Sequence, residues 1–87
     1  MTNINPDKLI KGEPYLIEIE RENGTRNTAV GFFNEYLEPP DPVFSKRLYF
    51  YNHMEEKLLP DHEKRKKYFA LHQIKSLTHL ERGEVIK

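Results

Sequence analysis

The stretch YLIEIERENGTRNTAVGFFNEYL, residues 15–37, decides the fold of this chain. Apolar side chains recur at every second position from Tyr15 to Ile19, and glutamates stand among the residues between and after them. This period-two alternation predicts a half-buried β-strand over residues 15–21. The pair Asn23-Gly24 tolerates the positive φ angles of a tight hairpin turn, so residues 27–37 are predicted to be the returning strand.

The returning strand breaks its own alternation, because Val30, Phe32 and Phe33 cannot all face one side of a sheet. Gly31 stands at the break, which predicts a β-bulge or a sharp bend at that position. Bends of this kind allow a short sheet to curl and close on itself.

A short helix is predicted before the hairpin, over residues 5–12. Asn5 suits its N-cap, Pro6 its first position and Gly12 its end. Such a helix has at most about two turns, so it must dock onto the rest of the chain to persist.

Further strands are predicted after the hairpin, beyond a proline-rich loop. The expected order is a loop at 38–42, a third strand at 47–53, an undecided segment at 54–66, a fourth strand at 67–72, a fifth strand at 74–80 and a charged tail at 81–87. The undecided segment either continues the third strand or forms a helical turn. In the third strand, Leu48 and Phe50 share one face, and Tyr49, Tyr51 and His53 share the other. Several short strands separated by turn signals predict a small barrel or sandwich.

The composition limits what the chain can do. The 87 residues predict one domain, with 37% hydrophobic and 32% charged residues. The formal net charge is zero, so any nucleic-acid site must be a local patch. Cysteine is absent, which excludes disulfides and zinc–thiolate sites. No segment reaches the roughly 18 apolar residues of a membrane span. Met1–Pro6 also lacks the apolar run of a signal peptide. A cytoplasmic protein without a membrane partner is therefore expected.

Two segments resemble the Sm-like (LSm/Hfq-type) family of small β-barrels. Asn23-Gly24 followed by Val30–Tyr36 is similar to the family's first motif, with Asn34 at the aspartate position and Tyr36 at the later ring position. Tyr68–Ser76 is similar to a short Lys-His-Ala-Ile-Ser stretch of the family, although Leu71 replaces its lysine. The resemblance implies a mostly β fold over residues 1–87: a strongly bent, five-stranded Sm-like or SH3-like barrel at 15–80 with a short N-terminal helix.

The family likeness also implies a homo-oligomeric ring, in which the fourth strand of one subunit pairs with the fifth strand of the next and satisfies both edges. It further implies a pore-side site for single-stranded RNA. The residues expected there are Asn34, Tyr36, His72, Gln73 and Lys75. Tyr36 would stack on a base, the amides and His72 would bond to base edges, and Lys75 would meet a phosphate. The alternative is that Tyr36 and His72 complete the core or a subunit contact.

Local charge argues against RNA at that pore. Glu35, Glu38 and Asp41 fall in or beside the loop that would face it, and carboxylates repel phosphates. The basic run Lys64–Lys67 is flanked by Asp61 and other acidic residues, which favours a solvated hairpin tip. A second function therefore stays open: a protein-interaction or assembly module on an SH3-like barrel, such as a virus-encoded adaptor, that binds no nucleic acid.

The sequence predicts neither an enzyme nor a cofactor. Ser45 and Ser76 lack the glycine-framed turn of a nucleophile elbow, and there is no phosphate-binding glycine loop. The four histidines have no zinc-binding spacing, so no metal site is expected. An 87-residue barrel also leaves little room for a deep pocket, so no small-molecule substrate is expected.

Overall fold

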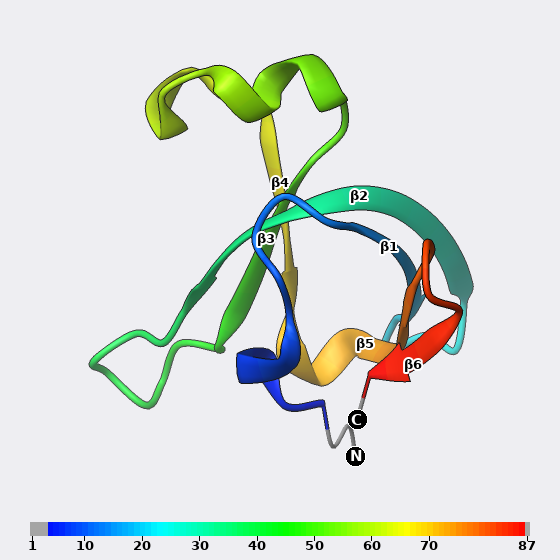
Figure 1. Ribbon diagram of the computed structural model, residues 1–87. Coiled ribbons are helices and arrows are strands. Elements are labelled where there is room, and N and C mark those ends of the chain that lie inside the picture. Colours follow the sequence, from blue (N-terminus) through cyan, green and yellow to red (C-terminus); the bar gives the residue numbers. More distant parts are fainter. Residues whose placement is uncertain (1–3, 87) are drawn as a thin grey trace.

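The computed structural model describes residues 4–86, which form one antiparallel sheet (Figure 1). The strands are β1 (Pro14–Glu20), β2 (Arg26–Leu37), β3 (Arg47–Tyr51), β4 (Lys66–Ala70), β5 (Ile74–His79) and β6 (Glu84–Ile86). Their spatial order is β4-β3-β2-β1-β5-β6. Four short 3₁₀ turns connect or precede them: η1 (Pro6–Lys8), η2 (Met54–Leu58), η3 (Asp61–Glu63) and η4 (Leu71–Gln73). The prediction of a mostly β protein is confirmed.

Two parts of the expected fold class are corrected: the sheet has six strands and is open, where a five-stranded barrel was predicted. The sixth strand arises in the expected tail. Gly83 adopts φ +65° and its N–H donates to the carbonyl of His79 at 2.7 Å, while the Arg82 N–H donates to His79 Nδ1 at 3.2 Å. This turn brings β6 back antiparallel to Leu77–His79 and buries Ile86 in the core.

The predicted N-terminal helix over 5–12 is only the single turn η1. Its start agrees with the sequence, since the Asn5 side chain accepts the Asp7 N–H and Pro6 opens the turn. Leu9 already has extended backbone angles, because its side chain points into the core and the chain must continue toward β1. A single turn without a following helical register cannot propagate.

The hairpin between β1 and β2 is confirmed. Its register pairs Pro14 with Phe32 and Glu20 with Arg26 without interruption. At the tip, the Arg21 N–H donates to the Thr25 carbonyl at 2.9 Å, and Gly24 has φ +83°. Asn-Gly therefore forms the turn for the reason that the sequence predicted.

The bulge lies three residues beyond its predicted position. The pairing of β2 with β3 shifts between Phe33 and Glu35, at Asn34. Gly31 serves a different purpose, because a Cβ atom there would come within 2.8 Å of the Phe50 Cβ. The glycine lets β3 approach closely, and β2 runs as a long arc across the sheet (Figure 1).

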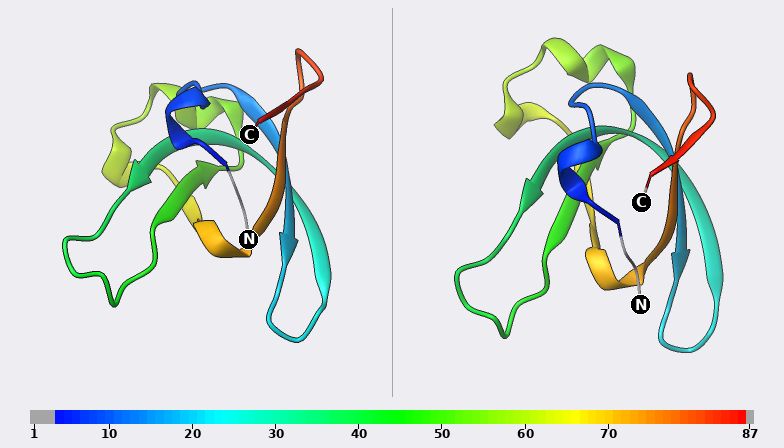
Figure 2. Two further views of the ribbon diagram at one scale, coloured as in Figure 1. Left: turned by 90° about the horizontal axis from the view of Figure 1, so that it is seen from below. Right: turned by 60° about the horizontal axis from the view of Figure 1, so that its bottom comes forward.

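The curved sheet encloses the core on its concave side (Figure 2). Six of its fully buried residues come from three strands: Tyr15 and Ile17 from β1, Leu48 and Phe50 from β3, and Ile74 and Leu77 from β5. Rings meet edge to face, with centroids of Phe33 and Phe50 5.7 Å apart. The core cluster thus joins residues of β3 and β5, strands that are not neighbours in the sheet.

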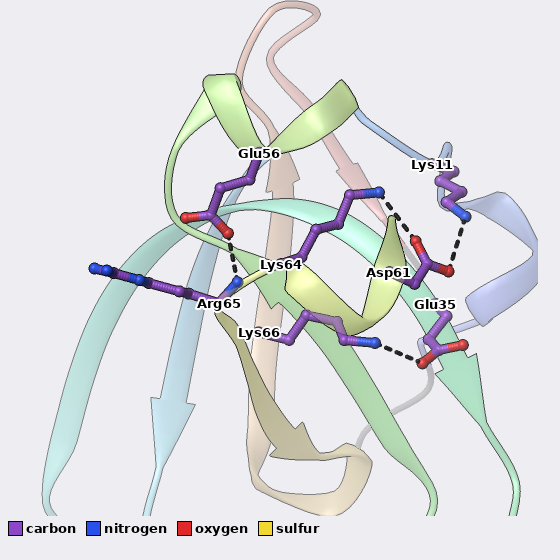
Figure 3. A network of polar contacts seen from close by, with 7 residues as sticks. All are labelled: Lys11, Glu35, Glu56, Asp61, Lys64, Arg65 and Lys66. Atoms are coloured by element: carbon purple, nitrogen blue, oxygen red, sulfur yellow. Dashed lines mark hydrogen bonds and ion pairs between the residues drawn. The ribbon is translucent and has the colours of Figure 1, made fainter. Parts of the chain in front are cut away.

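The undecided segment 54–66 is helical rather than a continued strand, because η2 and η3 occupy most of it. Glu56 is buried there and its carboxylate accepts the Arg65 backbone N–H at 2.6 Å (Figure 3). Asp61 binds Lys64 at 3.0 Å and Lys11 at 3.6 Å. The Glu56–Arg65 and Asp61–Lys64 contacts hold the segment together, and the Asp61–Lys11 ion pair ties it to the chain between η1 and β1.

Candidate nucleic-acid interface

The first two predicted site residues lie in β2 and are held by the fold. Asn34 occupies the bulge and is only 2% exposed, and neither of its amide atoms has a hydrogen-bond partner within residues 4–86. Tyr36 packs against the core, and its hydroxyl donates to the Glu38 carboxylate at 3.5 Å. Burial and the nearby Glu38 raise the pKa of Tyr36. A base could reach Asn34 only if the bulge opened, so the roles of these two residues in binding stay predictions.

The other three predicted residues lie around η4 and β5. His72 is exposed and Gln73 is half-buried, both in η4. Lys75, in β5, donates to the Glu20 carboxylate at 2.9 Å, and this bond lowers the pKa of Glu20. His72 and Gln73 are therefore neighbours in η4, whereas Lys75 forms an ion pair with Glu20 of β1.

Gln73 lies in an open cleft of about 640 Å³ between the end of β4 and the β1–β2 hairpin. We name this the seam cleft; it is lined by Ile19, Arg21, Glu22, Asn23, Tyr68, Phe69 and Gln73. The cleft combines two aromatic side chains with two amides, one cation and one carboxylate. Its size falls within the range of about 300–1,000 Å³ typical of small-ligand sites.

Next to the seam cleft, the convex side of β3 and β4 carries a group of rings and cations. We name this the tyrosine face; it consists of Arg47, Tyr49, Lys66 and Tyr68. The register sets Tyr49 directly opposite Tyr68, with ring centroids 5.7 Å apart. The Arg47 guanidinium lies 4.9 Å from the Tyr68 ring, a cation–π contact. Tyr68 is 56% exposed, so part of this side chain is accessible from solvent.

Ion pairs remove much of the negative charge that the sequence places near this region. Glu35 binds Lys66 at 3.4 Å and Glu38 binds Lys46 at 3.5 Å. Arg47 forms no ion pair with any carboxylate in residues 4–86. The net charge around the tyrosine face is therefore less negative than the sequence suggests. The expected repulsion of phosphates is weaker there for the same reason.

The basic run Lys64–Lys67 is mostly engaged within the protein, so the prediction of a solvated hairpin tip is wrong. Lys66 and Lys67 lie in β4, and the Lys64 side chain is only 5% exposed. Lys64 binds Asp61, Lys66 binds Glu35, and Lys67 reaches the Val30 carbonyl at 3.4 Å. The Arg65 side chain points away from this network (Figure 3). The run is thus a set of separate contacts and not one continuous basic patch.

The sequence predictions did not include Tyr68, Arg47 or Arg21 among the site residues. A partial signal was present, because Tyr49 and Tyr51 share one face of the third strand. The register with β4, which places Tyr68 against Tyr49, cannot be read from either segment alone. The seam cleft depends further on how far the sheet curls.

No group of three metal-ligating side chains stands together within residues 4–86. None of the helical turns in the same range is long and apolar enough to cross a bilayer. Comparison with known proteins found no matching family model, no matching curated protein and no matching solved structure.

Proposed function

We propose that this protein binds single-stranded RNA on the tyrosine face. The observation that carries the proposal is Tyr68, an exposed ring that lies between Tyr49 and the open seam cleft with Arg47 against it. Aromatic side chains beside cations form the stacking platforms on which proteins hold unpaired bases. In this proposal, the Arg47 guanidinium, which lies against Tyr68, binds a phosphate of the strand whose base stacks on that ring.

Two of the residues predicted from the sequence fit this arrangement. Gln73 lies in the seam cleft beside Tyr68, where its amide can bond to the edge of a stacked base. His72 is exposed in the same turn. Tyr36, Asn34 and Lys75 are not needed, because each is held by the core or by a neighbouring carboxylate.

The Sm-like relationship remains part of the proposal, with one modification. In the expected ring, the fourth and fifth strands are the two open edges. β4 is an edge of the sheet, which supports such pairing, whereas β5 lies between β1 and β6. β6 covers β5 at Leu77–His79, so a ring built through these edges requires β6 to move away. Binding on the tyrosine face does not depend on a ring.

Fluorescence polarisation with labelled 12-mers of uridine and adenosine tests the proposal. The wild-type protein should bind at low salt, and Tyr68→Ala should weaken binding by roughly 5- to 150-fold, the equivalent of about 1–3 kcal/mol for one lost stack. Phe44→Ala is the matched control, because Phe44 is also 56% exposed but lies in the β2–β3 loop. Absence of binding at low salt, or equal affinity of wild type and Tyr68→Ala, would refute the proposal.

One observation favours the alternative of a protein-interaction module. Val43 is 82% exposed and stands beside Phe44 in a proline-rich loop that projects from the sheet (Figure 2). Exposed apolar side chains at a loop tip are typical of a protein contact. Light scattering of wild type and Phe44→Ala separates the two functions: association that Phe44→Ala abolishes, together with no RNA binding, would favour the protein contact.

A further inference from the structure

We infer that the seam cleft is a subsite for one guanine base of the bound strand. This inference rests on the proposed function and specifies which base the site selects. It follows from the chemistry of the side chains that line the cleft, which match the hydrogen-bonding groups of guanine on both of its edges.

The polar side chains of the cleft have unused hydrogen-bonding capacity. Gln73, Arg21 and Glu22 form no side-chain hydrogen bond or ion pair within residues 4–86. Asn23 uses only its carbonyl oxygen, which accepts the Thr25 N–H at 3.0 Å and leaves the amide donors available. This bond also fixes the Asn23 side chain at the hairpin tip, so part of the site is already oriented.

The apolar walls suit a flat ring. Tyr68 and Phe69 are consecutive in β4 and project to opposite faces of the sheet, yet both border the cleft because β4 is the edge strand. Ile19, which is buried near the end of β1, borders the cleft just before the hairpin turn. A base can therefore be held against an aromatic surface while its edges point toward the hairpin tip.

Glu22 is the side chain that discriminates between bases. Guanine carries two adjacent donors, N1–H and the N2 amino group, which a carboxylate can accept together. Adenine and cytosine present an unprotonated ring nitrogen at the equivalent position, which a carboxylate repels, and uracil flanks its single donor with two acceptors. The other guanine edge presents the acceptors O6 and N7, the groups that an arginine binds with two bonds. Arg21 and the Asn23 amide supply donors for that edge.

The β1–β2 hairpin brings these opposite charges to the same wall of the cleft. Arg21 and Glu22 are neighbours in the turn, which is held closed by the Arg21 N–H donating to the Thr25 carbonyl and the Gly24 N–H donating to the Arg21 carbonyl, both at 2.9 Å. Gln73 approaches from the other wall, in η4. Arg21 and Glu22 thus reach the cleft from the hairpin, and the Gln73 amide reaches it from η4. A base bound between these two walls is contacted on more than one edge.

Single-guanine oligomers test the inference. Fluorescence polarisation compares U12 with otherwise identical 12-mers that carry one central guanosine, adenosine, cytidine or inosine. We expect the guanosine oligomer to bind roughly 5- to 150-fold more tightly than U12, the range of one bidentate base contact. Inosine lacks the N2 amino group and should lose part of this gain.

Glu22→Gln should remove the preference for guanosine over inosine, and Gln73→Ala should reduce the preference for guanosine over uridine. Glu81→Gln is the matched control, since it removes the same charge from an exposed residue of the β5–β6 turn. Far-ultraviolet circular dichroism of each variant checks folding.

The outcomes separate this inference from the proposed function. If wild-type protein binds all five oligomers equally, the guanine subsite is wrong while RNA binding on the tyrosine face stands. A guanosine preference that survives in both Glu22→Gln and Gln73→Ala also overturns the subsite. If no oligomer binds, the proposed function fails and the subsite fails with it.

Discussion

The two faces of β3 both carry aromatic side chains, but these side chains differ in their exposure to solvent. On the concave face, Phe50 is fully buried and meets the rings of Tyr15, Phe33 and Phe69. On the convex face, Tyr49 meets Tyr68 and Lys66, and Tyr68 remains 56% exposed. Tyr51 lies on this same face but is fully buried and stacks on Phe32, so the aromatic surface is open only toward Tyr49 and Tyr68. The buried rings of this strand stabilise the fold, and we propose that the open aromatic surface binds the ligand.

Phe50→Ala should have the largest effect on this comparison. The loss of a fully buried ring should reduce the free energy of unfolding by about 3–5 kcal/mol, enough to unfold a small domain. Tyr68→Ala, on the opposite face, should cost less than about 1 kcal/mol, because its ring is already exposed. Urea unfolding followed by circular dichroism measures both. Similar losses for the two variants would show that the convex face also carries the fold.

Gly31→Ala should have the next largest effect. The new methyl group would lie 2.8 Å from the Phe50 Cβ, closer than side-chain carbons approach, so β2 and β3 must separate. We expect a loss of about 1–3 kcal/mol in the free energy of unfolding, typical of overpacking. Gly24→Ala provides the contrast, because nothing lies within 4 Å of a Cβ there and only its φ of +83° is strained. An unchanged midpoint for Gly31→Ala would show that the close approach is not required.

Asn34→Leu should increase stability. The buried amide has no partner in residues 4–86, and leucine has nearly the same shape without polar atoms. Removal of an unsatisfied buried group should raise the free energy of unfolding by about 1 kcal/mol. The same variant tests the predicted role of Asn34 in binding, since the proposed RNA site does not use it. Reduced stability together with reduced RNA affinity would mean that the bulge opens and that Asn34 contacts the ligand.

The smallest effect concerns pH. The hydrogen bond from Lys75, with Arg26 nearby, lowers the pKa of Glu20. A lowered folded-state pKa stabilises the protein above the pKa of the unfolded carboxyl, and this contribution disappears as the pH falls through the folded-state pKa. Lys75→Ala should raise the pKa of Glu20 toward its ordinary value, as followed by NMR titration of the carboxyl carbon. Lys57→Ala should leave that titration unchanged; a shift there would point to long-range charge rather than the local bond.

The extent of sequence-based prediction differs between local and non-local features. The β1–β2 hairpin was predictable because the alternation of Tyr15–Ile19 and the Asn-Gly turn act within a few residues. The third strand followed from the same local pattern as far as Tyr51, but its predicted end at 53 was wrong, because His53 precedes the helical turn η2. The N-terminal helix was wrong because Asn5 and Pro6 specify how a helix starts, while the packing of Leu9 decides how far it continues. The position of the bulge was wrong because the close approach of Phe50 to Gly31 is a contact between strands.

Local sequence patterns alone indicate the five segments that become β1 to β5, the position of the hairpin turn and the apolar faces of β1 and β3. Period and turn chemistry are properties of neighbouring residues, so they are visible without coordinates. Only the tertiary structure decided that β6 returns to cover β5, that Asn34 is buried, and that Tyr68 lies opposite Tyr49 beside the seam cleft. These features depend on strand register and on the curvature of the whole sheet, which arise from contacts between residues far apart in the chain.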